Sequence, residues 1–228
     1  MDKGISTLLE VKEIGMDKKE MIVHSKDSPI GFIYPPKGQG DYFKVREFIF
    51  QDKLLTPTFA ETISLIYAAW KNPTNEFSKE ILNLLNRRLL WVYTGNLYIP
   101  NKGVYIQHNP NIKSGELDME ESDLEKKMKE GDATIRFVNF GFEIKELTKE
   151  EIYNHPYIMA MAGKEGAEKL AEIRELYGQF YLFSFRNVNK VMKTVSTIYS
   201  SQEKILFMSG ANLGINRGGY SFGISEAI

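Results

Sequence analysis

The fold of this chain is indicated most directly by residues 90–108, which read LWVYTGNLYIPNKGVYIQH. Apolar and aromatic residues fill three short runs, 90–94, 97–100 and 104–108, and the segments between these runs are rich in Gly and Asn. Gly followed by Asn favours a tight hairpin turn, because glycine adopts positive φ without steric cost. Residues 90–108 therefore predict a three-stranded antiparallel meander.

Two helices are predicted upstream of this meander, in residues 57–88. Thr56-Pro57 and Asn72-Pro73 each place a capping residue before a proline, which is typical of a helix start. Apolar residues then recur at spacings of three and four, so each helix has one apolar face and we expect an antiparallel pair. The two stripes are Phe59, Ile63, Ile66, Tyr67 and Trp70, and Phe77, Ile81, Leu84 and Leu85.

The residues before this pair combine short strands, a turn and a helix. Residues 6–34 alternate apolar and charged side chains and predict strands, and residues 42–53 predict a helix capped by Asp41. The intervening segment, residues 35–41, reads PPKGQGD and predicts a turn. Glycines before a helix can bind phosphate, but the Walker spacing is absent and Asp41 would repel an anion. A helix-capping turn is the preferred interpretation.

Beyond the meander, residues 109–115 predict a loop, and the elements after it alternate. We expect an acidic surface helix, two strands, a short helix with a capping box at Thr148, a longer helix closed by Gly178, and a strand. These occupy residues 120–130, 133–137 with 140–144, 148–155, 166–177 and 180–185.

Residues 188–199 fit a helical stripe, yet their β-branched residues favour a strand, and both interpretations stand. Residues 204–208 and 219–224 predict two strands. The glycine-rich residues 209–218 between them are interpreted as a hairpin loop, with a ligand-binding loop containing Arg217 as the alternative.

The predicted fold class is α+β, an antiparallel sheet with helices packed on its faces. Residues 1–228 are expected to form a single domain, and two lobes, 1–110 and 116–228, could be joined by the loop 109–115.

Composition excludes several classes of protein. The chain has no cysteine, which excludes disulfides, thiolate metal sites and cysteine nucleophiles, and its three histidines stand far apart, so no metal site is predicted. No cofactor is indicated. No run of eighteen apolar residues exists, and the first residues lack the apolar region of a secretory signal, so we expect no membrane partner and a cytoplasmic location.

Charge is distributed unevenly along the chain. Residues 81–115 and 176–202 contain no Asp or Glu, although acids occupy 30 of 228 positions. Between them, residues 116–175 carry 16 acids against nine Lys and Arg, a net charge of −7. Blocks of one sign can mark contact with a charged partner, and they also occur on ordinary solvated surfaces.

The first functional hypothesis is an anion or nucleic-acid interface formed by the acid-free segments. Cationic side chains neutralise phosphates and exposed aromatic rings stack on bases. The alternative is that half of the rings lie in the core and that the charges are ordinary scatter, and no motif of a known binding module is present. The candidate residues are Arg87, Arg88, Trp91, Tyr93, Lys102, Tyr105, Lys190, Lys193 and Arg217.

The second hypothesis is a metal-dependent phosphodiesterase or nuclease. Asp132 followed by Glu143 and Lys145 has the Asp…Glu-x-Lys order in which two carboxylates hold a divalent ion and lysine stabilises charge. The same triplet occurs as Glu10-Val11-Lys12, so solvated strand residues are the favoured interpretation.

These observations rank a non-enzymatic binding protein for nucleic acid or another anionic partner first, and a metal-dependent nuclease second. An oligomeric structural or interaction protein, in which the −7 segment of one copy meets the positive segments of another, comes third. The first hypothesis requires that the acid-free segments meet in space.

Overall fold

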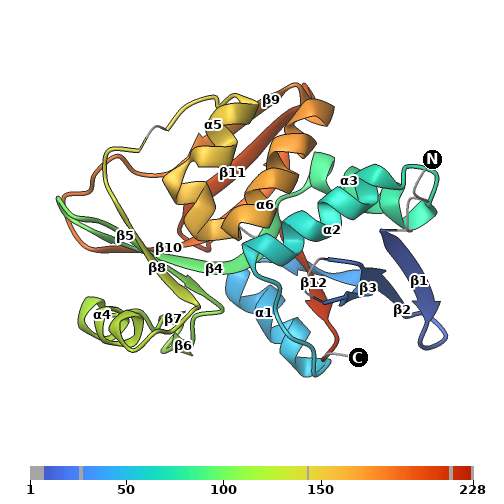
Figure 1. Cartoon of the computed structure of the whole chain (residues 1–228). Coiled ribbons are helices and arrows are strands. Elements are labelled where there is room, and N and C mark those ends of the chain that lie inside the picture. Colours follow the sequence, from blue (N-terminus) through green and yellow to red (C-terminus); the bar gives the residue numbers. More distant parts are fainter. Residues whose placement is uncertain (1–7, 26–27, 143, 216–217, 227–228) are drawn as a thin grey trace.

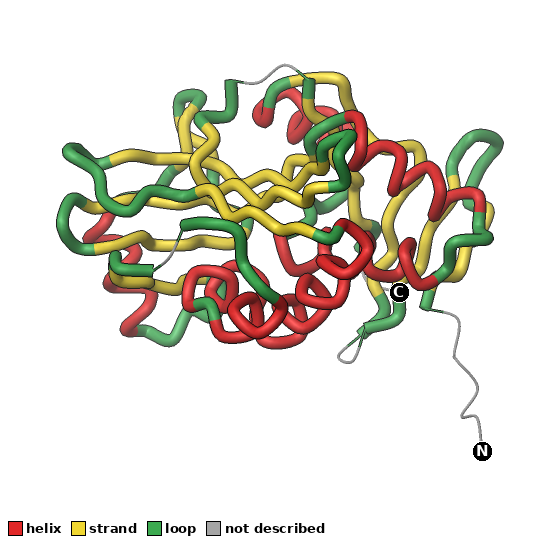
Figure 2. The backbone as a smooth tube through the Cα atoms, turned by 90° about the horizontal axis from the view of Figure 1, so that it is seen from above, coloured by secondary structure: helices red, strands yellow, loops and turns green. Residues whose placement is uncertain are grey.

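Figure 1 shows the computed structural model of the protein, which describes residues 8–25, 28–142, 144–215 and 218–226. Within these residues, ten strands form one sheet, in the order β1-β2-β3-β12-β4-β10-β11-β9, with β5 and β8 continuing from β4. In Figure 2 the strands form one band across the molecule, bordered by helices. The strands of this sheet are β1 (Leu9–Glu13), β2 (Lys19–Val23), β3 (Ile30–Gly40), β4 (Leu90–Ile99), β5 (Gly103–His108), β8 (Ile135–Asn139), β9 (Gln179–Phe183), β10 (Met192–Ser200), β11 (Ile205–Asn212) and β12 (Gly219–Ile224). A separate two-stranded sheet pairs β6 (Ile112–Lys113) with β7 (Glu116–Leu117).

The helices cover the sheet unequally. They are α1 (Tyr42–Gln51), α2 (Phe59–Lys71), α3 (Glu76–Arg87), α4 (Glu121–Lys129), α5 (Lys149–Asn154) and α6 (Pro156–Tyr177). In Figure 1, α5 and α6 lie on one side of the central strands, and α1 and α4 lie on the other.

Two apolar clusters follow from this arrangement. Successive residues of a strand point to opposite faces, so neighbouring residues of β4 join different clusters. Leu90 and Val92 pack with α2, α3, α5 and α6, whereas Trp91 and Tyr93 pack with α1 and α4. Burial of each large side chain on either face removes apolar area from water, at roughly 25 cal/mol per Å².

The predicted α+β class is confirmed, but the sheet is mixed rather than antiparallel throughout. Strand β9 pairs with β11 in parallel, and β12 meets β4 in parallel at Tyr220 and Leu90. Strands from both sides of the loop 109–115 share this one sheet, because β10 pairs with β4 along most of its length.

The predicted helix starts are confirmed with small shifts. Asp41 caps α1 by accepting a hydrogen bond from the Lys44 backbone nitrogen (2.9 Å). Thr58 and Asn75 cap α2 and α3, two or three residues after the predicted Thr56 and Asn72. Thr148 forms the predicted capping box with Glu151.

The three-stranded meander is wrong, because residues 90–99 form a single ten-residue strand. Gly95 and Asn96 lie inside β4, next to a register shift in the pairing with β10: Val195 pairs with Gly95, but Ser196 pairs with Val92. Glycine is needed here for close approach and not for a turn: a Cβ on Gly95 would lie 2.8 Å from the Met119 sulfur.

Three further sequence interpretations change. The predicted turn at 35–41 is mostly strand, since β3 continues to Gly40 beside β12. The helical interpretation of 188–199 is wrong, because β10 occupies most of it. Strands β11 and β12 are not a hairpin: β11 pairs with β10 and β9, whereas β12 pairs with β3 and β4.

Candidate functional site

One part of the sheet, at β9 and β11, has a face that no helix of the described residues covers. Along β9 and β11, buried and accessible residues alternate, and the buried ones lie in the cluster beneath α6. The accessible ones include Tyr181, Phe183 and Phe207, and Phe183 is 43% exposed. Tyr199 of β10 is half-buried on the same face, opposite Phe207. We call these four aromatic residues the aromatic row.

The rings of the aromatic row lie nearly parallel. Phe207 is at the centre, with its ring centroid 5.0 Å from that of Tyr199, 5.7 Å from Phe183 and 5.9 Å from Tyr181. Aromatic pairs at these separations attract one another beyond simple area burial. Tyr199 ends the row, because Phe207 is its only ring contact among the described residues.

A pocket of about 500 Å³ adjoins the Tyr199 end of the row. Its lining contains no Asp or Glu, and nine of its eleven residues come from the two acid-free segments. These residues are Asn86, Arg87, Arg88 and Leu89 from one segment and Thr197, Tyr199, Ser200, Ser201 and Gln202 from the other, joined by Ser209 and Asn212 of β11. We call this hollow the arginine pocket.

The polar groups of the arginine pocket are arranged for hydrogen bonding. Arg87 and Arg88 are exposed, and neither forms an ion pair within the described ranges. The Thr197 hydroxyl is buried without a hydrogen-bond partner in the same ranges. An adjoining hollow of about 390 Å³ adds Lys204, and the exposed Glu203 stands next to it in the chain. Together these groups can receive an anionic ligand, with Glu203 as the nearest acid along the chain.

The aromatic residues expected to stack on a ligand lie elsewhere. Trp91 and Tyr93 are fully buried, and Tyr105 is 3% exposed. The Trp91 indole nitrogen donates to the Gly40 carbonyl (3.1 Å), and the Tyr105 hydroxyl donates to Glu125 (3.0 Å). These three rings belong to the core and offer no face to a ligand.

Two of the predicted cations contact acids of the chain itself. Lys102 pairs with Glu121 (2.7 Å) and Lys193 pairs with Glu120 (2.8 Å), both at the start of α4. The negative middle segment therefore neutralises part of the positive segments within one chain. Lys190 is exposed in the approach to β10, and Arg217 lies outside the described residues.

The nuclease residues are not brought together by the part of the chain that the structure describes. Asp132 precedes β8 and accepts hydrogen bonds from the Thr134 backbone and hydroxyl (2.8 and 2.7 Å). Lys145 follows the other end of β8 and pairs with Glu151 (3.0 Å). Glu143 lies outside the described residues. Within those residues, no group of three or more His, Asp or Glu is placed to hold a metal ion.

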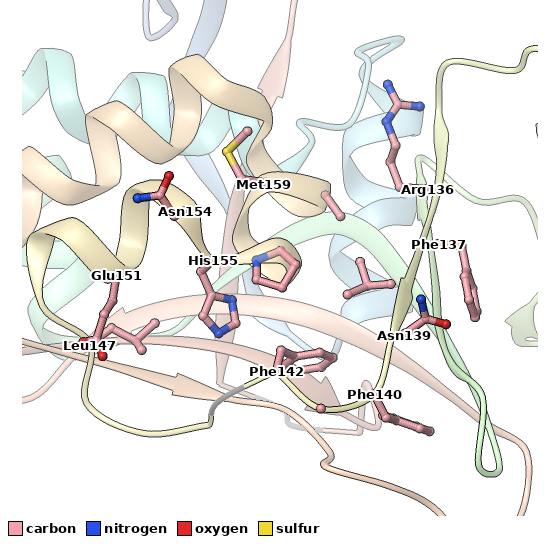
Figure 3. A pocket seen from close by; sticks show the side chains of 14 residues that line it. Arg136, Phe137, Asn139, Phe140, Phe142, Leu147, Glu151, Asn154, His155 and Met159 are labelled. Atoms are coloured by element: carbon pink, nitrogen blue, oxygen red, sulfur yellow. The ribbon is translucent and has the colours of Figure 1, made fainter.

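Another hollow, with a volume of about 840 Å³, lies between the end of β8 and the junction of α5 with α6 (Figure 3). Phe140, Phe142 and Met159 give it an apolar lining, and Phe142 packs edge-on against the buried His155 (ring centroids 5.7 Å). Glu151 is engaged by Thr148 and Lys145, which hold its pKa near 2. The described residues that line this hollow can contact an apolar ligand, but they do not include two charged side chains that both lack a partner. This hollow was not predicted from the sequence.

Sequence reasoning also missed the aromatic row. The rings are visible in the sequence, since residues 179–183 (QFYLF) and 205–209 (ILFMS) are almost continuously apolar or aromatic. Such runs do not tell which face of a strand a helix will cover, so the accessible rings could not be separated from the buried ones.

Comparisons with protein-family models, with curated proteins and with solved structures gave no match. None of the helices described is both long and apolar enough to cross a membrane.

Proposed function

We propose that this protein binds single-stranded nucleic acid on the open face of β9, β11 and β10. The observation that supports the proposal most strongly is the meeting of the two acid-free segments at the arginine pocket, beside the aromatic row. The bases would stack against the rings, and the backbone phosphates would face Arg87, Arg88 and Lys204.

The balance of forces favours a modest affinity. Stacking on an aromatic side chain contributes about 1–3 kcal/mol per base and tolerates any sequence. Three cations facing phosphates give a salt dependence of about −2 in log K against log salt for a single strand. The net charge of −1 adds no general attraction, so binding depends on this face alone.

Phe183→Ala tests the proposal. Phe183 is 43% exposed and stacks on Phe207, so its removal should weaken binding of a labelled oligothymidylate about tenfold, with little loss of stability. Fluorescence anisotropy measures the affinity. Phe50→Ala is the matched control, because Phe50 is 50% exposed on α1, which packs mainly against β3 and β12.

Charge is tested separately by replacing Arg87 and Arg88 with Met. The double variant should bind more weakly and show a shallower salt dependence, whereas Lys79→Met on the same helix should behave like the wild type. Absence of oligonucleotide binding, together with self-association of the wild-type protein in sedimentation, would instead assign this face to a second copy of the chain.

A further inference from the structure

A separate cavity, of about 660 Å³, lies between α1 and the residues that follow β5. Phe43, Phe50 and Ile112 give it an apolar character, and Arg46 is also among its lining residues. This volume is in the range of pockets that hold small organic ligands. Helix α1 packs against β3 and β12, which lie on the other side of β4 from β10, β11 and β9 in the strand order.

Arg46 is a buried cation that forms no ion pair with any acid of the described residues. Arg46 is only 8% exposed. Its Nε and Nη1 atoms are buried and have no hydrogen-bond acceptor in the described ranges. The guanidinium carbon lies 5.1 Å from the centroid of the Phe50 ring. A charge withdrawn from water in this way costs several kcal/mol unless a partner compensates it.

Two buried tyrosine hydroxyls adjoin this cation. The Tyr42 hydroxyl lacks a hydrogen-bond partner among the described residues, whereas the Tyr93 hydroxyl interacts with the Ser221 side chain. The two ring centroids are 4.9 Å apart. Burial raises the pKa of both hydroxyls, and the nearby positive charge of Arg46 lowers it in part. Both tyrosines are therefore neutral donors close to the guanidinium.

No acid in the part of the chain that the structure describes fills this position. Glu47 lines the cavity, but it is exposed, and its Oε1 accepts a hydrogen bond from Gln51 (3.3 Å). A free carboxylate can accept charge-assisted hydrogen bonds from arginine, and an apolar body attached to it can contact the surrounding rings. Glu47 would repel such a ligand, which limits its affinity.

We propose that this cavity binds an organic monocarboxylate with an apolar body, its carboxylate facing Arg46. The unpaired cation provides the recognition, and Phe43, Phe50 and Ile112 contact the apolar part. This site is separate from the proposed nucleic-acid face and does not depend on it.

Octanoate is the probe, with octanol, acetate and inorganic phosphate as comparisons. Octanoate should bind saturably in calorimetry and change the fluorescence of Trp91, whose ring meets that of Tyr42 at 5.7 Å. Octanol and acetate should each bind at least tenfold more weakly, because octanol lacks the carboxylate and acetate lacks the apolar body. Equal binding of octanol or of phosphate would overturn the proposal.

Arg46→Met removes the charge and keeps the apolar stem. It should weaken octanoate binding at least tenfold while raising the melting temperature of the free protein, because a costly unpaired charge is lost. Arg136→Met, which changes the hollow of about 840 Å³ beside β8, is the matched control. Unchanged octanoate affinity in Arg46→Met would contradict the proposal.

Phe50→Ala provides a second test on an exposed position that folding tolerates. It should weaken octanoate binding and leave oligonucleotide binding intact, whereas Phe183→Ala should do the reverse. Loss of both ligands in either variant would show that the two sites are not separate.

Discussion

The hydroxyls of Tyr98 and Tyr157 meet where β4, β11 and α6 come together. Tyr98 donates to the Gly210 carbonyl (2.9 Å), and Tyr157 donates to the Asn96 side chain (2.8 Å). Both rings are fully buried, so each hydroxyl depends on these protein partners in place of water. This network joins the longest helix to the centre of the sheet by directional bonds as well as by apolar contact.

Gly210→Ala should disrupt this network. A Cβ at residue 210 would lie 1.6 Å from the Tyr157 hydroxyl oxygen, so either the helix or the strand must move. We expect a loss of about 3 kcal/mol or more in unfolding free energy, measured by urea denaturation. Gly15→Ala, whose new Cβ has no neighbour closer than 4.0 Å, should change little. A wild-type urea midpoint in Gly210→Ala would contradict the packing described.

His108 should make stability depend on pH. Burial, assisted by the positive charge of Arg136, lowers its pKa to about 4 from an ordinary 6.5. Below pH 6.5, His108 becomes protonated in the unfolded chain but stays neutral in the folded protein. The free energy of unfolding therefore decreases as the pH falls from neutral toward 4. Between pH 7 and pH 5 this loss amounts to about 2 kcal/mol.

Urea midpoints across that pH range measure the effect. His108→Gln can retain a hydrogen bond to Thr94 and should show a flatter pH profile than the wild type. His24→Gln, at a histidine whose side chain is 40% exposed, is the control. Parallel profiles for His108→Gln and the wild type would exclude His108 as the source.

At the scale of elements, the start of α2 is stabilised by a reciprocal cap. The Thr58 side chain accepts from the Glu61 backbone nitrogen, and Glu61 accepts from the Thr58 backbone nitrogen (2.6 Å). Thr58→Ala should lower the unfolding free energy by about 1 kcal/mol in urea denaturation. Thr74→Ala, just before the Asn75 cap of α3, should cost less. Equal losses would mean that the cap contributes no more than helix propensity.

The helices can be predicted from the sequence more easily than the order of the strands, because helix caps and apolar stripes depend on residues that are close in the sequence. The sheet depends on distant partners. At Gly95-Asn96 the local preference for a turn is overridden, since β5 and β10 pair with β4 on its two sides and hold it extended. The conformation of residues 188–199 is determined in the same way. Strand pairing with β4 and β11 outweighs the helical spacing of their apolar residues.

For the candidate site, sequence reasoning found the charged residues and missed the rings. Arg87 and Arg88 were recognisable from the absence of acids around them. The accessible rings were not, because Tyr93 and Tyr199 have similar strand contexts and differ only in whether α1 lies over them. Helix coverage is a property of the whole fold and has no local signature.

At the scale of the whole molecule, charge and coverage divide the sheet into two regions. Acids of α4 pair with Lys102 and Lys193 near β5, where α1 and α4 cover the second face. At the β9 edge the same face is open, and the arginine pocket has no acid in its lining. The overall charge of −1 therefore conceals one region whose charge is already paired and another whose cations remain accessible.

Photocrosslinking to a 4-thiouridine oligonucleotide, with the modified residues mapped by mass spectrometry, tests this account most directly. The account predicts crosslinks on Tyr181, Phe183, Tyr199 and Phe207, diminishing as salt is raised. Crosslinks confined to α1 or α4, or a yield no greater than that of an unrelated protein, would contradict it.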